Sequence, residues 1–179
     1  MKKYKIICLM GEAGSGKDTI MQKVLRHCEG KLHEIVSCTS RPPREGEKDG
    51  VNYHFLDKEN FIKKIDSNDM IEYTYFNNWF YGTSYDSLNP NKINIGVFNP
   101  EGIRKLRNRH DIDLKIFGIQ ATPKNRMIRQ LEREEDPDVY EIVRRFNTDA
   151  KDFSKIDFPF CCLLNNAVYD KIIAAGTIV

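Results

Sequence analysis

The sequence lacks a strong charge of either sign and any long apolar run. Its 179 residues include 28 Lys and Arg and 26 Asp and Glu, which give a formal net charge of +2 at pH 7. This even balance provides no electrostatic reason to expect nucleic acid or a membrane surface as a partner. The longest apolar runs are far shorter than the roughly 20 residues of a membrane span, and no signal-peptide core of the required length follows residues 1–3. We expect a cytoplasmic protein, either a monomer or a homodimer.

The sequence also lacks a metal-ligand spacing among its five cysteines. An odd number without such spacing favours reduced thiols in a cytosolic chain over a disulfide framework or a zinc site. Cys8, Cys161 and Cys162 lie in apolar runs, where we expect small buried residues.

The sequence contains no internal repeat and no low-complexity tail, and its length suits one domain. Apolar runs that predict strands alternate with amphipathic segments that predict helices. Strands are expected at 6–10, 34–37, 52–56, 70–76, 80–83, 92–98, 113–120 and 160–164, and helices at 16–27, 58–65, 100–109, 124–134, 137–153 and 168–174. The strands at 70–76 and 80–83 are expected to form a hairpin around Asn77-Asn78. The alternation predicts an α/β fold with a parallel, doubly wound sheet.

A glycine loop of the form G-x-x-x-x-G-K follows the first predicted strand. Gly11, Gly14 and Gly16 allow positive φ and close approach of the backbone to a ligand, so successive N–H groups can surround an anion. The next helix directs its positive dipole end at the same point, and Lys17 adds a mobile positive charge. The loop therefore predicts a triphosphate site formed by Gly11, Glu12, Ala13, Gly14, Ser15, Gly16, Lys17, Asp18 and Thr19. The alternative is a glycine turn that only joins a strand to a helix.

One position departs from the usual form of this loop. The Ser or Thr that normally follows the lysine and binds Mg²⁺ is Asp18 here, and a hydroxyl comes one residue later at Thr19. A carboxylate is a good ligand for a hard cation, so Asp18 is a candidate to hold Mg²⁺ directly or through water. In the alternative, Asp18 caps the helix and Thr19 or water serves the metal.

A second group of polar residues lies in segment 37–47. Arg41 and Arg44 are three residues apart and next to prolines, an arrangement suited to the planar oxygens of a phosphate. Tyr53 and Tyr81 could add hydroxyl donors to the same oxygens. The alternative interpretation is a solvated basic loop.

These residues carry a resemblance to the guanylate kinase family of nucleoside monophosphate kinases. The family's run S-x-x-T-R-x-P-R-x-G-E-x-x-G-x-x-Y-x-F matches residues 37–55, with Ser40 in place of the family's threonine. Its I-E and Y-G-[ST] motifs match residues 71–72 and 81–83 at the family's spacing. The resemblance covers the N-terminal half closely and the remainder loosely.

The resemblance implies a P-loop NTPase fold of three layers, with a parallel five-stranded sheet, a small α+β insert that binds the nucleoside monophosphate, and a helical lid. It places the core at 1–36, 88–124 and 147–179, the insert at 37–87 and the lid at 125–146. The implied reaction is ATP-dependent phosphorylation of GMP or dGMP, with Mg²⁺ as cofactor and nucleotides as the partners.

Carried over by residue, the resemblance implies that Arg41, Arg44, Tyr53 and Tyr81 hold the monophosphate, and that Ser37, Glu72 and Thr83 read the base. The chemistry agrees, because guanine presents O6 as an acceptor beside two N–H donors. A carboxylate accepts both donors and a hydroxyl donates to O6, whereas adenine would leave buried groups unpaired. The alternative for Glu72 is a solvent-facing residue of the hairpin.

The resemblance also implies a lid in which arginines reach the phosphates during transfer. Arg129 and Arg133 would share a helix face, and Arg145 follows in the next helix. Gln130 stands where the family usually has arginine. We expect Lys17, Arg41, Arg133 and Arg145 to be catalytic and Arg129 to contact ATP; the alternative is an ordinary surface helix with salt bridges.

Val97 and Asn99 lie near the end of the third predicted core strand, at 92–98, in positions where guanylate kinases usually have aspartates near the metal and the guanine. Asn99 can still hydrogen-bond a base, but no carboxylate remains here for Mg²⁺, which favours Asp18 as the metal ligand. Three alternatives stay open: a broader nucleoside monophosphate or sugar-phosphate kinase, a non-catalytic binding module, and a nucleic-acid NTPase, which the even charge disfavours.

Overall fold

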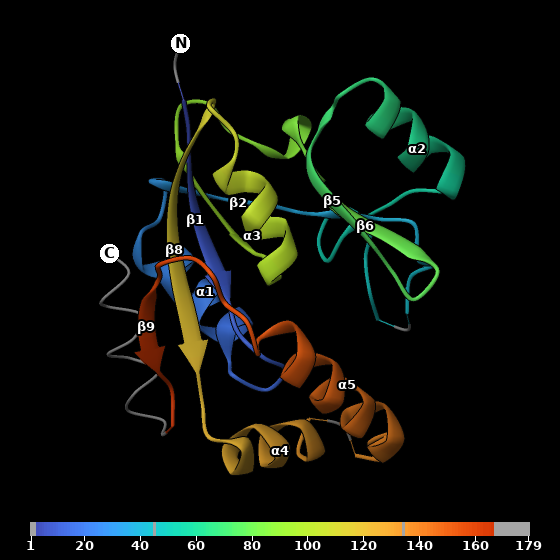
Figure 1. Cartoon of the computed structure of the whole chain (residues 1–179), viewed down its shortest axis with the longest axis vertical. Helices are drawn as coiled ribbons and strands as arrows, with labels where there is room; N and C mark the ends of the chain where they lie inside the picture. The colour runs from blue at the N-terminus through green and yellow to red at the C-terminus, as the bar shows by residue number, and fades with distance from the viewer. Residues whose placement is uncertain (1–2, 45, 134, 167–179) are drawn as a thin grey trace. The chain divides into compact units, whose positions relative to one another are not determined.

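The computed structural model describes residues 3–44, 46–133 and 135–166 (Figure 1). The described chain forms two compact units. Unit 1 contains residues 3–6, 31–44, 46–96 and 101–114, and unit 2 contains residues 7–30, 97–100, 115–133 and 135–166. The predicted insert at 37–87 lies in unit 1, and the predicted lid at 125–146 lies in unit 2.

The described helices are α1 (Lys17–His27), α2 (Lys58–Asp66), α3 (Pro100–Arg107), α4 (Pro123–Leu131) and α5 (Val139–Asp152), with a short 3-10 turn, η1 (Tyr85–Ser87). The described strands are β1 (Tyr4–Met10), β2 (Leu32–Glu34), β3 (Cys38–Thr39), β4 (His54–Phe55), β5 (Met70–Phe76), β6 (Trp79–Ser84), β7 (Ile93–Val97), β8 (Ile112–Gln120) and β9 (Cys161–Leu164). The helix expected at 168–174 lies outside the described residues.

The main sheet has five strands in the order β2-β7-β1-β8-β9. β2 pairs with β7 and β8 pairs with β9 in parallel, as the alternation of elements predicts. The α/β class and the five-stranded sheet of a P-loop NTPase are therefore confirmed. β1 and β8 each begin in unit 1 and end in unit 2.

One expected strand is wrong, and one expected helix is confirmed but is shorter at its C-terminal end. The strand expected at 34–37 is replaced by β2 and β3, which belong to different sheets. The amide of Ile35 still bonds to Ile95 of β7, while the carbonyl of Ser37 already accepts from His54, so the chain changes sheets within these residues. The helix expected at 124–134 ends at Leu131, which leaves Arg133 outside it.

Unit 1 also contains a four-stranded sheet in the order β4-β3-β6-β5. The predicted hairpin of β5 and β6 is confirmed, and Asn77 and Asn78 both have positive φ, 48° and 67°. Asparagine tolerates that conformation, which matches the twist of paired strands. Helix α2 covers the sheet with Phe61, which is fully buried and stacks on Phe80 with a centroid distance of 5.3 Å.

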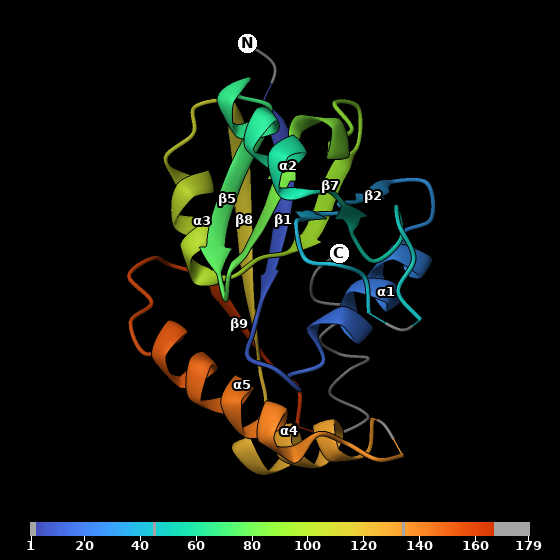
Figure 2. The ribbon, with the colours of Figure 1, turned by 90° about the vertical axis from the view of Figure 1, so that its right-hand side faces the viewer.

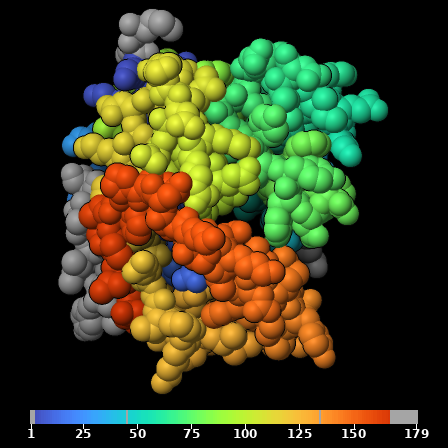
Figure 3. Space-filling model, in the orientation of Figure 1, coloured from blue at the N-terminus to red at the C-terminus, as the bar shows by residue number. Residues whose placement is uncertain are grey.

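Unit 2 is built on the buried end of β1 and on helix α1, which buries Ile20, Met21 and Val24. Helices α4 and α5 contact each other, as Figures 1 and 2 and the space-filling view in Figure 3 show. None of the helices in the described part of the chain is both long and apolar enough to cross a membrane.

The expectation of buried cysteines holds for Cys8 and fails for Cys161 and Cys162, which are exposed. Both exposed cysteines lie on β9, the last strand in the order of the sheet. Only Leu163 of the four β9 residues is buried. An apolar run at a sheet edge thus leaves part of its surface in contact with solvent.

Candidate active site

The glycine loop between β1 and α1 has the backbone that its sequence predicts, with one difference. Gly14 and Gly16 have φ values of +78° and +88°, in the region that favours glycine. Gly11 does not have positive φ; it is required by crowding, because a Cβ there would lie 2.4 Å from the carbonyl oxygen of Ile119 and 2.6 Å from Ser15 Oγ. The loop therefore fits tightly beside the end of β8.

The N-terminus of α1 is available to an anion. Its N-cap is Gly16 in the left-handed conformation, without a side-chain capping bond. The amides of the first helical turn have no partner inside a helix, and the helix dipole adds partial positive charge at this end. Lys17 is mostly buried, with 20% of its side chain exposed. These groups fit the phosphates of a nucleotide.

Asp18 does not cap the helix. Its side chain is 75% exposed and its carboxylate lies 3.7 Å from Lys17 Nζ. Among the described residues no cluster of three or more His, Cys, Asp or Glu side chains could hold a metal by itself. Mg²⁺ in phosphate-transfer sites usually takes one or two carboxylates, and water and substrate phosphates supply the other ligands. A single exposed carboxylate beside the phosphate loop fits that requirement.

Side chains from α4 and from the segment after β9 bind the carbonyl oxygens of the loop. Arg129 Nη1 donates to Gly14 O and Ser15 O at 3.2 and 3.3 Å, and Asn165 Nδ2 donates to Ser15 O at 2.6 Å. Arg129, predicted to contact ATP, therefore lies against the phosphate loop. Arg133 lies beyond the end of α4, so the expected shared helix face does not exist.

Arg145, the other predicted lid arginine, is paired within its own helix. Its Nε lies 2.9 Å from Glu141 Oε1, and Arg144 binds the same carboxylate. The hydrogen bonds from Arg144 and then Arg145 lower the pKa of Glu141 to about 2, so Glu141 is ionised at neutral pH. The printed contact engages only Nε of Arg145, so the pair with Glu141 orients the guanidinium and does not occupy all of its N–H donors.

Sequence reasoning missed Arg126. This residue of α4 is 3% exposed, and it contacts Glu12, the carbonyl of Ala13 and Asp149. Its spacing of three residues from Arg129 was the available signal, because residues i and i+3 of a helix share a face. Charged helical residues usually face solvent, and the partners of Arg126 are remote in the sequence.

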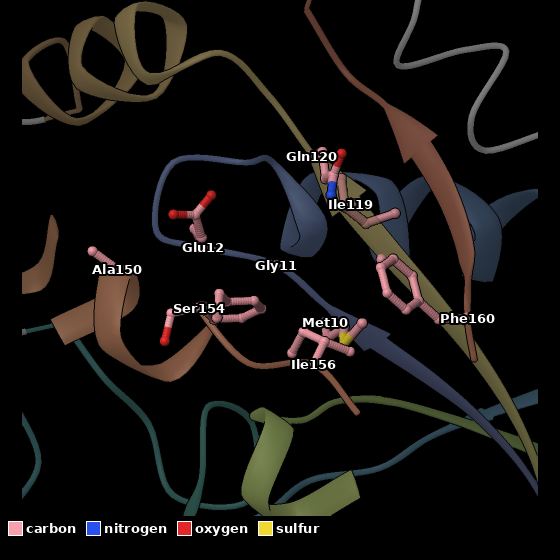
Figure 4. Close-up of a pocket in the computed structure, with 11 residues that line it drawn as sticks. Met10, Gly11, Glu12, Ile119, Gln120, Ala150, Ser154, Ile156 and Phe160 are labelled. Carbon is pink, nitrogen blue, oxygen red and sulfur yellow. The ribbon is translucent and has the colours of Figure 1, made fainter. Parts of the chain in front are cut away.

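A cavity of about 220 Å³ lies beside the same loop in unit 2 (Figure 4). Met10, Ile119 and Phe160 contribute to its walls, and Glu12 contributes a carboxylate. No Lys, Arg or His belongs to its lining, so the cavity offers no side-chain cation to a phosphate. We expect the triphosphate at the α1 end of the loop instead.

In unit 1, Arg41 forms a two-pronged ion pair with Glu47. Nη1 and Nη2 lie 2.9 Å from the two carboxylate oxygens, and Nη1 also donates to Pro42 O. The amide of Arg44 donates to the same carboxylate at 2.7 Å. The hydrogen bond from Arg41 lowers the pKa of Glu47, which keeps the carboxylate ionised. Glu47 thus joins the two predicted phosphate-binding arginines.

The two predicted phosphate-binding tyrosines lie near Arg41. Its guanidinium carbon is 5.6 Å from the centre of the Tyr53 ring, and the rings of Tyr53 and Tyr81 are 6.3 Å apart. In the described part of the chain, the contacts of Arg41 engage Nη1 and one hydrogen of Nη2. The edge formed by Nε and the second Nη2 hydrogen is left to bind two oxygens of a phosphate.

The three predicted base-reading residues also meet in unit 1. Glu72 pairs with Thr83 across the hairpin, and the hydroxyls of Thr83 and Ser37 are 3.4 Å apart. Glu72 is 8% exposed, so the alternative of a solvent-facing residue is wrong. A Cβ at Gly82 would lie 2.5 Å from Glu72 O, which explains the glycine beside Thr83. Asn99 is exposed and belongs to unit 2.

Burial controls the protonation of Glu72. Desolvation raises the pKa of its carboxyl to about 7, although hydrogen bonds from Thr83 and the charge of Lys105 oppose the rise. Among the residues that the structure describes, no direct ion pair neutralises the charge of the ionised Glu72. A ligand with two adjacent N–H donors would stabilise that charge.

Comparisons with known proteins identify the family. The family model described as guanylate kinase matches residues 3–175. The chain belongs to the guanylate kinase family. It is 30% identical over 162 residues to the guanylate kinase of Campylobacter jejuni strain RM1221, covering 86% of this chain and 78% of that protein. It is 42% identical over 122 residues to the guanylate kinase of Schizosaccharomyces pombe, covering 68% and 55% of the two chains.

The fold of this guanylate kinase family member matches solved structures. The crystal structure of guanylate kinase from Anaplasma phagocytophilum superposes with a TM-score of 0.69 at 19% identity, covering 99% of this chain and 84% of that one. Membership of the family identifies the protein as a nucleoside monophosphate kinase, a transferase.

The raised pKa of Glu72 predicts a specific pH dependence of stability. The folded pKa of about 7 exceeds the ordinary value of 4.5, so between these values the folded state binds more protons than the unfolded state. The free energy of unfolding should therefore fall as pH rises from 4.5 to 7, by up to roughly 3 kcal/mol from this group. In the Glu72→Gln variant the side chain keeps its shape but cannot ionise. The pH-dependent change in the free energy of unfolding that Glu72 contributes should therefore be absent.

Denaturant unfolding of wild type and Glu72→Gln at several pH values gives the difference between their free energies of unfolding. Because the two proteins share all other carboxyl groups, the contributions of those groups cancel in this difference. A difference between wild type and Glu72→Gln that stays constant from pH 4.5 to 8 would contradict the assigned burial effect.

Proposed function

We propose that this protein catalyses the phosphorylation of GMP or dGMP by ATP, yielding GDP or dGDP and ADP. The observation that carries the proposal is the cluster of Ser37, Glu72 and Thr83, which pairs a buried carboxylate with two hydroxyls. The carboxylate would accept the N1 and N2 hydrogens of guanine, and a hydroxyl would donate to O6. The acceptor's phosphate would bind Arg41, Arg44, Tyr53 and Tyr81.

In this proposal the base pocket favours guanine because another base would leave buried hydrogen-bonding groups without partners. Adenine presents an acceptor at N1, which would face the ionised form of the Glu72 carboxylate without a hydrogen between them. Leaving such buried groups unpaired costs several kcal/mol, whereas a missing apolar contact costs less. Guanine alone among the common bases matches two donors and one acceptor in this order.

ATP would bind the phosphate loop of unit 2. Its phosphates would lie against the amides of Gly14, Gly16 and the first turn of α1, with Lys17 following the transferred group. Asp18 and Thr19 would hold Mg²⁺, which neutralises charge on the phosphates when bound. The exposed carboxylate of Asp18 replaces the aspartates that Val97 and Asn99 do not supply.

The proposed transfer is a direct, in-line displacement without a covalent enzyme intermediate. The oxygen of the acceptor's phosphate attacks the terminal phosphorus of ATP, and the bond from that phosphorus to the ADP oxygen breaks. Lys17, Arg41, Arg133 and Arg145 would stabilise the charge spread over the moving group. In this proposal residues 37–87 act as the monophosphate-binding insert and residues 125–146 as the lid, which closes to exclude water.

A broader range of acceptors is the second candidate. Asn99 favours it, because the amide carries both a donor and an acceptor where the family usually has a carboxylate. Such a residue discriminates less strictly between bases. The candidate acceptors are other nucleoside monophosphates and small sugar phosphates.

The first test measures ADP formation with ATP and Mg²⁺ against GMP, dGMP, AMP, CMP, UMP and dTMP, with a control that lacks an acceptor. We expect turnover with GMP and dGMP and at least about a hundredfold lower kcat/KM with AMP, the size of effect that unpaired buried groups produce. Similar turnover with several bases would favour the broader kinase. Binding of GMP without turnover would favour a non-catalytic binding module.

The metal role of Asp18 predicts a shift in Mg²⁺ dependence. Asp18→Ala should raise the Mg²⁺ concentration for half-maximal activity by about tenfold or more, because it removes the one protein carboxylate assigned to the cation. Asp18→Ser, which restores the usual residue of such loops, should recover part of the affinity. Unchanged Mg²⁺ dependence in Asp18→Ala would exclude the carboxylate as a ligand.

The ion pair of Arg41 predicts a role for Glu47 in phosphate binding. Glu47→Gln removes the charge and one acceptor oxygen, so Arg41 should lose its fixed orientation and the Kd for GMP should rise by about tenfold. Glu59→Gln, on the exposed face of α2, is the matched control. Titration calorimetry with GMP and with an ATP analogue separates the two sites, and equal weakening of both ligands would contradict the assignment.

A further inference from the structure

Arg126 is the buried cation of an ion cluster beside the phosphate loop, and its two carboxylate partners are partly exposed. Its Nη1 lies 2.6 Å from Glu12 Oε1 and its Nη2 lies 3.3 Å from Asp149 Oδ2. The guanidinium carbon lies 4.4 Å from the centre of the Phe146 ring, and the side chain is 4% exposed. One cation thus connects α4 and α5 to the loop within unit 2.

The cluster holds both polar groups of one loop residue. Arg126 Nε donates to the carbonyl of Ala13 at 3.0 Å, and the amide of Ala13 donates to Asp149 Oδ2 at 2.6 Å. The backbone of α4 also contacts the loop, because a Cβ at Gly14 would lie 2.5 Å from Arg126 O. The peptide planes on both sides of Ala13 are therefore set by side chains from two helices.

This orientation determines where the loop's amides point. In a planar trans peptide, the carbonyl and the following N–H point in opposite directions. Arg126 holds the carbonyl of Ala13, and Arg129 holds those of Gly14 and Ser15. The amides of Gly14 and Gly16 consequently point away from α4, as a loop that surrounds an anion requires.

Stability alone does not explain the cluster. Burying the guanidinium of Arg126 costs several kcal/mol, and an apolar residue of similar volume often stabilises a core as well or better. The two carboxylates would repel a phosphate, so they are not ligands. Both carboxylates pair with Arg126 and so hold its guanidinium in place, and Asp149 also accepts a hydrogen bond from the loop amide of Ala13.

We propose that Arg126, together with Glu12 and Asp149, positions the phosphate loop in its anion-binding conformation before the nucleotide binds. The proposal rests on the proposed function only in taking ATP as the ligand of the loop. Loop ordering then costs less free energy when the triphosphate arrives, which raises its affinity. A planar fork with several donors is needed, because the three acceptors lie in different directions from one side chain.

The test measures the Kd of the β,γ-imido analogue of ATP with Mg²⁺, and separately the Kd of GMP, by titration calorimetry on the full chain. Arg126→Gln should raise the Kd of the analogue by about tenfold or more, which corresponds to 1.4 kcal/mol. Arg126→Lys should give an intermediate value, because an ammonium lacks the fork. GMP, whose proposed ligands apart from Asn99 lie in unit 1, should keep its Kd within about twofold.

Two further variants separate positioning from folding. Arg26→Gln changes an exposed arginine of α1 in the same unit and should leave both Kd values unchanged. The triple variant Glu12→Gln, Arg126→Met, Asp149→Asn removes all three charges and leaves no buried carboxylate unpaired. Its thermal midpoint should stay near that of the wild type while its affinity for the analogue falls.

Wild-type affinity for the analogue in the folded triple variant would overturn the proposal. So would a loss of analogue and GMP binding in parallel with a lowered thermal midpoint, because that pattern indicates unfolding. A wild type that binds the analogue but does not phosphorylate GMP would reject the proposed function and leave the measurement on Arg126 valid. A wild type that binds no triphosphate would reject both.

Discussion

The backbone conformation of residues 11–17 is the constraint on which the chemistry of unit 2 depends. It needs left-handed φ at Gly14 and Gly16, and it leaves no room for a side chain at Gly11. Contacts from α4, α5 and the segment after β9 bind its carbonyls and one of its amides. The polar groups left over are donors at the start of α1, where the helix dipole adds to their charge.

Unit 1 handles charge in two different ways. Arg41 is already paired with Glu47, so its orientation exists before a phosphate binds. Glu72 is instead buried with hydroxyl partners, its pKa is raised to about 7, and no described residue forms a direct ion pair with its ionised form. In the proposed reaction the first arrangement supplies a prepared phosphate contact. In the second arrangement, the ionised Glu72 carboxylate is stabilised by the N–H donors of the incoming base, so a base without these donors binds less tightly.

The local parts of this arrangement were predictable from the sequence. The hairpin register brings Glu72 opposite Thr83, and a two-residue Asn-Asn turn is sufficient to set that register. The loop of Gly14 and Gly16 is likewise set by neighbours in the chain. Predictions failed for features that depend on contacts with residues distant in the sequence. The end of α4 before Arg133 and the exposure of Cys161 and Cys162 depend on which surfaces other elements cover.

The sequence by itself determined the α/β class, the glycine loop, the motifs shared with guanylate kinases, and the family. All of these rest on short-range spacing, because glycine conformations, strand alternation and hairpin pairing act over a few residues. Only the tertiary structure decided that Arg126 lies under the loop with Glu12 and Asp149. Its partners are more than 100 residues earlier and 23 residues later in the chain. A buried charge becomes recognisable only when folding has excluded water and brought its counter-charges together.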